Sequence, residues 1–251
     1  MDFGTYAGAS AGTAHLKKLE IASNNLANIS TIGFKRTFIK QEEQPFEKTL
    51  AAQDKNDVTA KPDHDRYAGV SNFETFVDFT QGPINQTGNP LDVALKNPKD
   101  FFVVQSENGP RYTRAGNFTI GAGGVLCAQD GSPVLSDGGP INVDQGTPTI
   151  TPDGSVIVNS QLVGRIQVVR FEDPQKNLIP DGNSHFKTSR GAPETVIGEI
   201  VPQAIEQSNV QPVTAMLDLI GVNRGFDMYS RAARSIDEMN QQAISGLGRA
   251  R

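Results

Sequence analysis

Residues 215–247 read AMLDLIGVNRGFDMYSRAARSIDEMNQQAISGL and carry the longest periodic pattern in the chain. Apolar or small residues recur there at alternating spacings of four and three, the period of a helix that packs along another helix. These residues are Ala215, Leu219, Val222, Phe226, Tyr229, Ala233, Ile236, Asn240, Ala243 and Leu247. The preceding Ser208 or Asn209 is a candidate N-cap. We therefore predict a C-terminal helix within residues 206–251.

The N-terminal residues 1–35 show a similar pattern and predict a second helix. Small or apolar residues alternate by four and three at Thr5, Ala9, Gly12, Leu16, Leu19, Ser23 and Leu26. Gly4, Gly8 and Gly12 also recur every four residues, so a partner backbone could approach closely. Each such glycine costs a helix about 0.5–1 kcal/mol relative to alanine. We expect a partner to decide whether this helix forms.

Between the two ends, the sequence predicts a mainly antiparallel β domain over residues 66–205. Short apolar strings such as Phe101 to Val104 alternate with Asn-Gly and Asp-Gly pairs, which favour hairpin turns because glycine tolerates positive φ. These pairs begin at Asn108, Asp130, Asp137, Asp153 and Asp181. Residues 36–65 are polar and weakly periodic, which indicates a linker or an extended arm. The fold class is α+β, with the β domain inserted between two terminal helices.

Composition excludes several functions. The 251 residues carry a net charge of −5 without a strongly basic segment, which argues against nucleic-acid binding. No apolar run approaches the roughly 20 residues of a membrane-spanning helix, so we expect no membrane insertion. The start of the chain lacks the cationic and apolar blocks of a secretory signal peptide. The single cysteine, Cys127, excludes an intrachain disulfide and a cysteine-based zinc site.

Candidate catalytic and cofactor motifs lack the structural context that their chemistry needs. Residues 8–12 match the G-x-S-x-G pattern of hydrolases, but no strand precedes them. Residues 121–124 are glycine-rich but lead into a strand rather than into a phosphate-binding helix, so a wide hairpin loop is the better interpretation. The three histidines show no metal-ligand spacing. We expect no enzyme activity, catalytic residue, metal, cofactor or small-molecule substrate.

A remote alternative is a β-rich enzyme that acts on the cell wall and uses paired carboxylates such as Asp92, Asp100 or Glu107. The sequence does not place these carboxylates in one cleft. A soluble adaptor whose terminal helices already pair in the monomer is a further alternative.

Residues 23–36, SNNLANISTIGFKR, contain more residues with a particular conformational role than the end of a helix requires. Three asparagines crowd the end of the first helix although asparagine competes with the helical backbone for hydrogen bonds. Gly33 is suited to a left-handed turn, and Phe34 to an apolar anchor. These residues are candidates for helix capping or for contact with a neighbouring chain.

This stretch resembles the N-terminal signature of bacterial flagellar rod and hook proteins, the axial family of the basal body. Residues 87–95 (TGNPLDVAL), 101–104 (FFVV) and 112–118 (YTRAGNF) are similar to the central β region of that family. Residues 208–210 (SNV), 224–226 (RGF) and 237–239 (DEM) are similar to its C-terminal helix. The chain start and length are most similar to a proximal-rod component, with a distal-rod or hook-type protein as the alternative.

The resemblance implies that the terminal helices pair as a coiled coil and pack head-to-tail with homologous rod proteins, with the β domain outside. It also implies a location in the periplasmic rod and passage through the flagellar type III export apparatus without a cleaved signal. The candidate assembly residues are Leu16, Leu19, Asn24, Asn25, Leu26, Asn28, Gly33, Phe34, Ser208, Asn209, Val222, Arg224, Phe226, Tyr229 and Ile236.

Overall fold

A computed structural model describes residues 3–44, 70–143 and 146–248 of the chain. The chain divides into two compact units. One unit contains both long helices and most of the first two strands, and the other contains residues 27–37 and 77–211. The predicted fold class, mixed helix and sheet with mainly antiparallel pairing, is confirmed.

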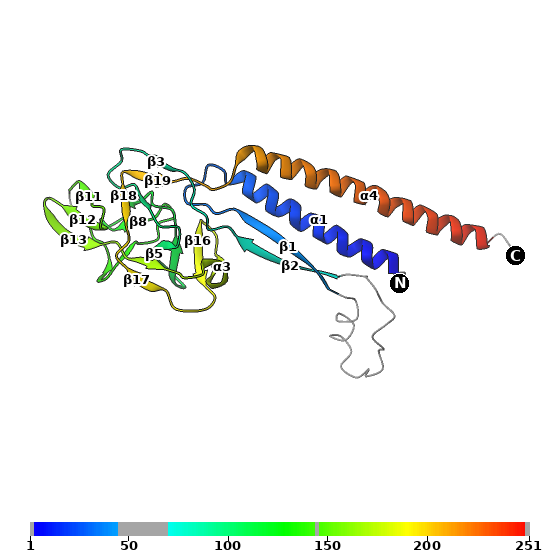
Figure 1. Cartoon of the computed structure of the whole chain (residues 1–251), viewed down its shortest axis with the longest axis horizontal. Coiled ribbons are helices and arrows are strands. Elements are labelled where there is room, and N and C mark those ends of the chain that lie inside the picture. Colours follow the sequence, from blue (N-terminus) through cyan, green and yellow to red (C-terminus); the bar gives the residue numbers. More distant parts are fainter. Residues whose placement is uncertain (1–2, 45–69, 144–145, 249–251) are drawn as a thin grey trace, which may run out of the picture. The chain divides into compact units, whose positions relative to one another are not determined.

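Two long helices lie at the ends of the chain, as predicted (Figure 1). Helix α1 spans Phe3–Ala27 and helix α4 spans Pro212–Gly248. At 37 residues, α4 is about 55 Å long. Because α4 begins at Pro212, the prediction that Ser208 or Asn209 caps it was wrong. Proline suits the first helical position because it has no N–H to leave unpaired.

The predicted linker or arm over residues 36–65 begins as a strand. Strand β1 spans Thr37–Gln44 and pairs with β2, Val70–Val77, in a two-stranded sheet (Figure 1). Residues 45–65 of the predicted arm lie outside the described residues.

The largest sheet of the β unit has six antiparallel strands in the order β15-β16-β6-β5-β14-β17. Its strands are β5 (Asp100–Ser106), β6 (Gly109–Thr113), β14 (Val168–Arg170), β15 (Leu178–Pro180), β16 (His185–Thr188) and β17 (Glu194–Val196). The short helix α3, Pro174–Asn177, lies between β14 and β15 in the sequence.

Smaller sheets complete the unit. The three-stranded sheet contains β11 (Pro148–Ile150), β12 (Ser155–Val158) and β13 (Gln161–Arg165). The two-stranded pairs are β3 (Ile84–Gln86) with β19 (Ala204–Glu206), β4 (Val93–Leu95) with β18 (Ile200–Pro202), β7 (Thr119–Ile120) with β8 (Leu126–Cys127), and β9 (Leu135–Ser136) with β10 (Gly139–Pro140).

The five predicted turn pairs all connect antiparallel partners, so these predictions are confirmed. They connect β5 to β6, β9 to β10, β11 to β12 and β15 to β16, and the pair at Asp130 lies inside the bridge between Cys127 and Pro133. The glycine-rich residues 121–124 join the antiparallel strands β7 and β8, which confirms a hairpin loop in place of a phosphate-binding loop.

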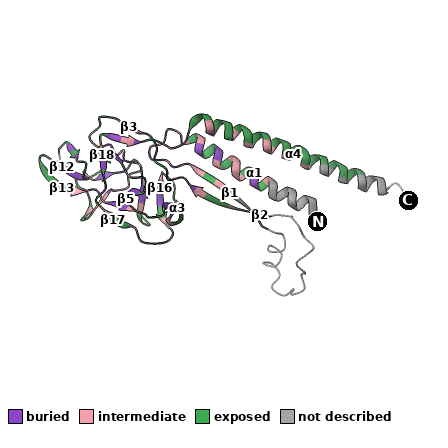
Figure 2. Cartoon of the chain, in the orientation of Figure 1, coloured by how far each residue is buried: buried purple, intermediate pink, exposed green. Residues whose placement is uncertain are grey.

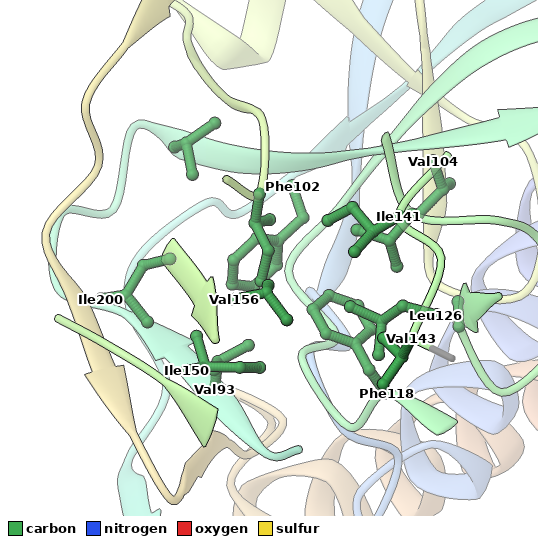
Figure 3. Close-up of a cluster of buried hydrophobic side chains, with 14 of the residues drawn as sticks. Val93, Phe102, Val104, Phe118, Leu126, Ile141, Val143, Ile150, Val156 and Ile200 are labelled. Carbon is green, nitrogen blue, oxygen red and sulfur yellow. The ribbon is translucent and has the colours of Figure 1, made fainter. Parts of the chain in front are cut away.

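Strand β5 lies between two hydrophobic clusters, which explains its continuous apolar sequence. Successive side chains of a strand point to opposite faces. Phe102 and Val104 belong to one cluster, and Phe101 and Val103 belong to the other. Figure 3 shows the first cluster, where the rings of Phe102 and Phe118 meet edge to face with centroids 5.2 Å apart. The middle of the chain is therefore a β unit with its own two-sided core.

The turn between β11 and β12 holds its aspartate by two hydroxyl groups. Ser155 Oγ donates to Asp153 Oδ2 at 2.6 Å, and Thr151 Oγ1 donates to Asp153 Oδ1. Gly154 has φ +82°, a conformation that glycine adopts without a steric cost. The hydroxyl bonds, with Ser155 contributing most, lower the pKa of the Asp153 carboxyl from 3.8 to about 2.

We expect the Asp153 carboxyl to titrate with a midpoint of about 2 in the native protein, measured by NMR. Ser155→Ala should raise this pKa toward the ordinary value because the carboxylate loses its main donor. Since the folded pKa is depressed, the stabilising contribution is present above the unfolded pKa of about 3.9 and is lost as the pH falls through the folded value. Ser189→Ala is the matched control, because the Ser189 hydroxyl donates to the Lys176 carbonyl oxygen. An unshifted midpoint in the native protein would contradict this account.

Candidate assembly interface

A fully buried carboxylate joins two fully buried cations inside the β unit. Glu206 Oε1 accepts a hydrogen bond from Lys35 Nζ at 2.6 Å. Glu206 Oε2 accepts from Arg114 Nε at 2.8 Å, and Arg114 Nη2 lies 2.6 Å from the same oxygen. All three side chains have zero exposure. We call Lys35, Arg114 and Glu206 the ionic clamp.

The clamp joins segments that are far apart in the sequence. Lys35 follows α1, Arg114 follows β6, and Glu206 ends β19, shortly before α4 begins. The Glu206 backbone carbonyl also accepts from Gly33 N at 2.8 Å, and its side chain accepts from Gly82 N at 2.9 Å. The segment that leaves α1 and the segment that leads to α4 are thus tied to the same β unit.

Two glycines allow the backbone to pack around the clamp. Gly33 has φ +68°, which confirms the predicted left-handed turn. A Cβ atom at Gly33 would collide with the backbone at Arg114 and Ala115. A Cβ atom at Gly82 would collide with the Gln207 carbonyl oxygen. Because each obstacle is backbone, a larger residue at either position would force these two chain segments apart.

The electrostatics of the clamp are dominated by burial. Desolvation lowers the pKa of Lys35, and the nearby Glu206 carboxylate opposes this shift. Desolvation likewise lowers the pKa of Arg114, again against the effect of Glu206. A buried ion pair holds only if its remaining polar atoms are also hydrogen-bonded.

Backbone carbonyl groups meet this requirement. Lys35 Nζ donates to the Thr80 carbonyl oxygen at 2.6 Å. Arg114 Nη1 donates to the Asn97 and Asp100 carbonyl oxygens, each at 2.6 Å. A second ion pair lies beside this network, since Arg170 donates to the buried Asp100 carboxylate through Nε at 2.6 Å and Nη2 at 3.0 Å. The clamp is therefore part of a network that reaches the six-stranded sheet.

Four candidate assembly residues gather around the clamp. The Asn209 side chain accepts from Arg36 N at 2.7 Å and donates to the Asp78 carbonyl oxygen at 2.8 Å. Ser208 Oγ accepts from Val210 N at 3.2 Å. Phe34 is half-buried beside the buried Gly33. These bonds lie within one chain, so contact of the four residues with a neighbouring subunit stays a prediction.

Helices α1 and α4 meet at small residues. A Cβ atom at Gly12 would lie 2.9 Å from Tyr229 Cε1, so the tyrosine ring rests where a side chain would otherwise be. The His15 ring stacks on Tyr229 with centroids 6.2 Å apart, and a Cβ atom at Gly225 would lie 3.0 Å from His15 Cε1. At Gly12 the close neighbour is a side chain, whereas the sequence analysis expected a partner backbone.

The predicted apolar face of α4 is its more buried face, but a second face is exposed (Figure 2). Ala215 is buried, and Leu219, Val222, Phe226 and Tyr229 are half-buried. Large apolar residues on the other side of the first turns are exposed, namely Val213 (70%), Met216, Leu217 (63%) and Ile220. The residues spaced alternately by four and three identify only the first face, so the second face was not predicted from the sequence.

The other candidate residues lie along the helices or directly after α1. Leu16, Asn24 and Arg224 are exposed, Leu19, Leu26 and Asn28 are half-buried, and Asn25 is buried. The side chain of Ile236 lies outside the described residues. Assembly contacts of all these residues stay predictions.

Two of the carboxylates considered for a cell-wall enzyme have hydrogen-bond partners within the chain. Asp100 binds Arg170, and Asp92 accepts from Thr87 Oγ1 at 2.7 Å and Asn89 Nδ2 at 3.0 Å. Within the described ranges, no group of three His, Cys, Asp or Glu side chains is arranged to hold a metal ion. None of the described helices combines the length and apolar character needed to cross a membrane.

Three family models match the chain in order. Residues 6–35 match the model described as flagella basal body rod protein. Residues 97–158 match the flagellar hook protein FlgE/F/G D1 domain, and residues 201–246 match the flagellar basal body rod FlgEFG protein C-terminal model. Each matched region supplies one residue of the clamp. The chain belongs to the family of flagellar basal-body rod proteins, which confirms the resemblance seen in its sequence.

Individual relatives refine this assignment. The chain is 34% identical to the flagellar basal-body rod protein FlgF of Caulobacter vibrioides, over 99% of both chains. It is 32% identical to the FlgF of Salmonella typhimurium, over 97% of both chains. It is 29% identical to the flagellar basal-body rod protein FlgG of Agrobacterium fabrum, over 90% of this chain and 92% of that protein.

We expect Glu206→Gln to destabilise the protein by about 3–5 kcal/mol, because the substitution keeps the side-chain shape but leaves two buried cations without their carboxylate. Urea unfolding measures the change. Adding Lys35→Met removes one of these cations and should recover part of the loss. Glu199→Gln is the matched control, since Glu199 pairs with Lys96 at the surface; it should leave the unfolding midpoint unchanged. Equal midpoints for Glu206→Gln and the native protein would contradict the role of the clamp.

Proposed function

We propose that the protein is a structural subunit of the flagellar basal-body rod, of the FlgF type, and that it polymerises through its terminal helices. The observation that carries the proposal is the exposed apolar face on the first turns of α4, in a chain that belongs to the rod family. The higher identity to the two FlgF relatives than to the FlgG relative supports the FlgF type over a distal-rod protein.

The exposed face of α4 suits contact with another subunit. Val213, Leu217 and Ile220 follow the spacing of one helical face, and Met216 widens it. An exposed apolar surface of this kind is typical of a protein–protein contact. On α1, Leu16 is also exposed. These residues are available to neighbouring helices because the opposite side of α4 already carries Tyr229 against α1.

Within each subunit, α1 and α4 pair as a coiled coil. The contact of Tyr229 with Gly12 and of His15 with Gly225 supports this pairing. Between subunits, the outer face of α4 packs against different residues of the next copy. A contact between two different surfaces repeats from copy to copy and builds an open helical assembly instead of a closed pair. Such an assembly is a drive shaft that transmits torque.

The partners follow from this function. They are homologous rod subunits and, during delivery, the flagellar type III export apparatus, which passes the chain to the periplasmic rod without removing a signal. The protein catalyses no reaction and needs no cofactor. Asp100, one of the carboxylates considered for an enzyme, already has a structural partner in Arg170, which supports this view.

Phe226→Asp should abolish incorporation into the rod, because a charge on the half-buried apolar face of α4 prevents its pairing with α1. Leu217→Asp should also abolish incorporation, but by blocking the outer face while α1 and α4 still pair. Motility in soft agar and immunoblots of isolated basal bodies measure both effects. Asn223→Asp places a carboxylate at an exposed polar position of α4 and serves as the control that keeps motility. Normal motility in Phe226→Asp or Leu217→Asp would refute the proposal.

Hydrogen exchange on the dilute protein should separate the helices from the β unit. We expect slow exchange in residues 77–143 and 146–211, and also in residues 27–37, because the clamp ties that segment to the β unit. Residues 3–26 and 212–248 should exchange faster than the β unit, because pairing of α1 with α4 alone leaves their outer faces uncovered until neighbouring subunits pack there. Equal protection of the helices in the dilute protein would contradict assembly-dependent ordering and would favour a soluble adaptor.

A further inference from the structure

The segment that leaves α1 buries a charged side chain where an apolar anchor would be usual. We call residues 28–36 the entry segment. The structure describes the whole of it, and only Gly33 and Lys35 within it are buried. Its large apolar residues are all half-buried, namely Ile29, Ile32 and Phe34. An ammonium group leaves water favourably only where a carboxylate and further hydrogen bonds compensate it. Docking of the entry segment therefore depends on what compensates Lys35.

This compensation comes from the far end of the β unit. We call residues 200–209, which include β18 and β19, the strap. The strap supplies the Glu206 carboxylate that accepts from Lys35 Nζ at 2.6 Å. It also supplies the Glu206 backbone carbonyl oxygen that accepts from Gly33 N at 2.8 Å. Both bonds are lost when the strap is displaced.

The end of the entry segment is also held by the strap. The Asn209 side chain accepts from Arg36 N at 2.7 Å. Two further bonds come from outside the strap: Lys35 Nζ donates to the Thr80 carbonyl oxygen, and Asp78 N donates to the Arg36 carbonyl oxygen at 2.8 Å. Neither of these two bonds supplies a carboxylate for Lys35. Without the strap, the entry segment would bury an ammonium group against carbonyl oxygen alone.

The strap has anchors that do not involve the entry segment. Strand β18 pairs with β4, and β19 pairs with β3. Ile200 belongs to the first hydrophobic cluster (Figure 3), and Ala204 is fully buried. Gln207 N donates to the Pro83 carbonyl oxygen at 2.9 Å. The strap can therefore dock before the entry segment, whereas the entry segment depends on the strap.

We propose that the strap controls the docking of the entry segment, so that residues 28–36 bind the β unit only after residues 200–209 have done so. The entry segment carries α1, and the strap leads to α4. The segment after α1 is then anchored only in a chain whose C-terminal part of the β unit has already folded. Release of the strap releases the anchors of both helices together. This device is a property of the single chain and does not depend on the rod function.

Two matched glycine substitutions test the order of docking, with backbone amide NMR signals of the purified full chain as the readout. Gly82→Ala displaces the strap, because its Cβ atom would collide with the Gln207 carbonyl oxygen. We expect signals of the strap and of the entry segment to leave their native positions together. Gly33→Ala displaces the entry segment, because its Cβ atom would collide with the backbone at Ala115. Here only the entry-segment signals should move.

The outcomes distinguish one-way from mutual dependence. Native entry-segment signals beside a displaced strap in Gly82→Ala would overturn the proposal, because the entry segment would then dock unaided. Loss of the strap signals in Gly33→Ala would also overturn it. Gly221→Ala is the control, since a Cβ atom at this position of α4 meets nothing within 4 Å, and it should leave both sets of signals in place. If a variant loses the β5 and β6 signals as well, the Glu206 variant decides.

Glu206→Gln tests the charge requirement, because it keeps the shape of the strap but leaves Lys35 without its carboxylate. The other charged groups that act on Lys35 are Arg114, which stays ionised, and Asp78, whose effect is the smallest. The entry segment should then dock only with an uncharged Lys35. Since docking releases one proton, we expect the ratio of docked to undocked entry segment to rise about tenfold per pH unit below the ordinary pKa of lysine.

The native protein should keep its entry segment docked throughout this pH range. Adding Lys35→Met to Glu206→Gln should restore docking and remove the pH dependence, because no charge has to be buried at that position. A ratio that does not change with pH in Glu206→Gln would overturn the proposal. An undocked entry segment in the double variant, beside native strap signals, would overturn it as well.

Discussion

A single buried carboxylate has to bind two buried cations, and the rest of the β unit is arranged around this requirement. Glu206 uses both oxygens, one for Lys35 and one for Arg114. Taking these charges out of water costs several kcal/mol per ion, so the cluster exists only where backbone carbonyl groups accept the remaining N–H groups. The carbonyl oxygens of Thr80, Leu95, Asn97 and Asp100 provide these acceptors. Strands that are distant in sequence must therefore converge at one point.

The clamp also explains why the ends of the β unit are built from polar residues. The chain enters the unit after α1 and leaves it before α4, and both segments would fray if only loops held them. Gly33 lets the entering segment turn and hydrogen-bond to Glu206. Asn209 bonds the leaving segment to the backbone at Arg36 and Asp78. An amide side chain suits this position because it donates and accepts at the same time.

Local signals made part of this architecture predictable from the sequence. Turn pairs such as Asp153-Gly154 act over a few residues, and the alternating apolar residues of α4 identify a helix and one of its faces. The clamp was not predictable, because Lys35, Arg114 and Glu206 are separated by long stretches of chain and a lone charged residue normally indicates an exposed position. Asn209 looked like a helix cap because its real partners, the backbone at Arg36 and Asp78, are distant in sequence. Ser208 instead accepts from Val210 N, before α4 begins.

The two faces of α4 suit the proposed assembly. A subunit that formed only a symmetric dimer would need one self-complementary surface. This chain instead has two faces on α4, of which one meets α1 and the other exposes Val213 and Leu217. Surfaces that complement each other but not themselves build a polymer, because each copy satisfies one surface of its neighbour and presents the other.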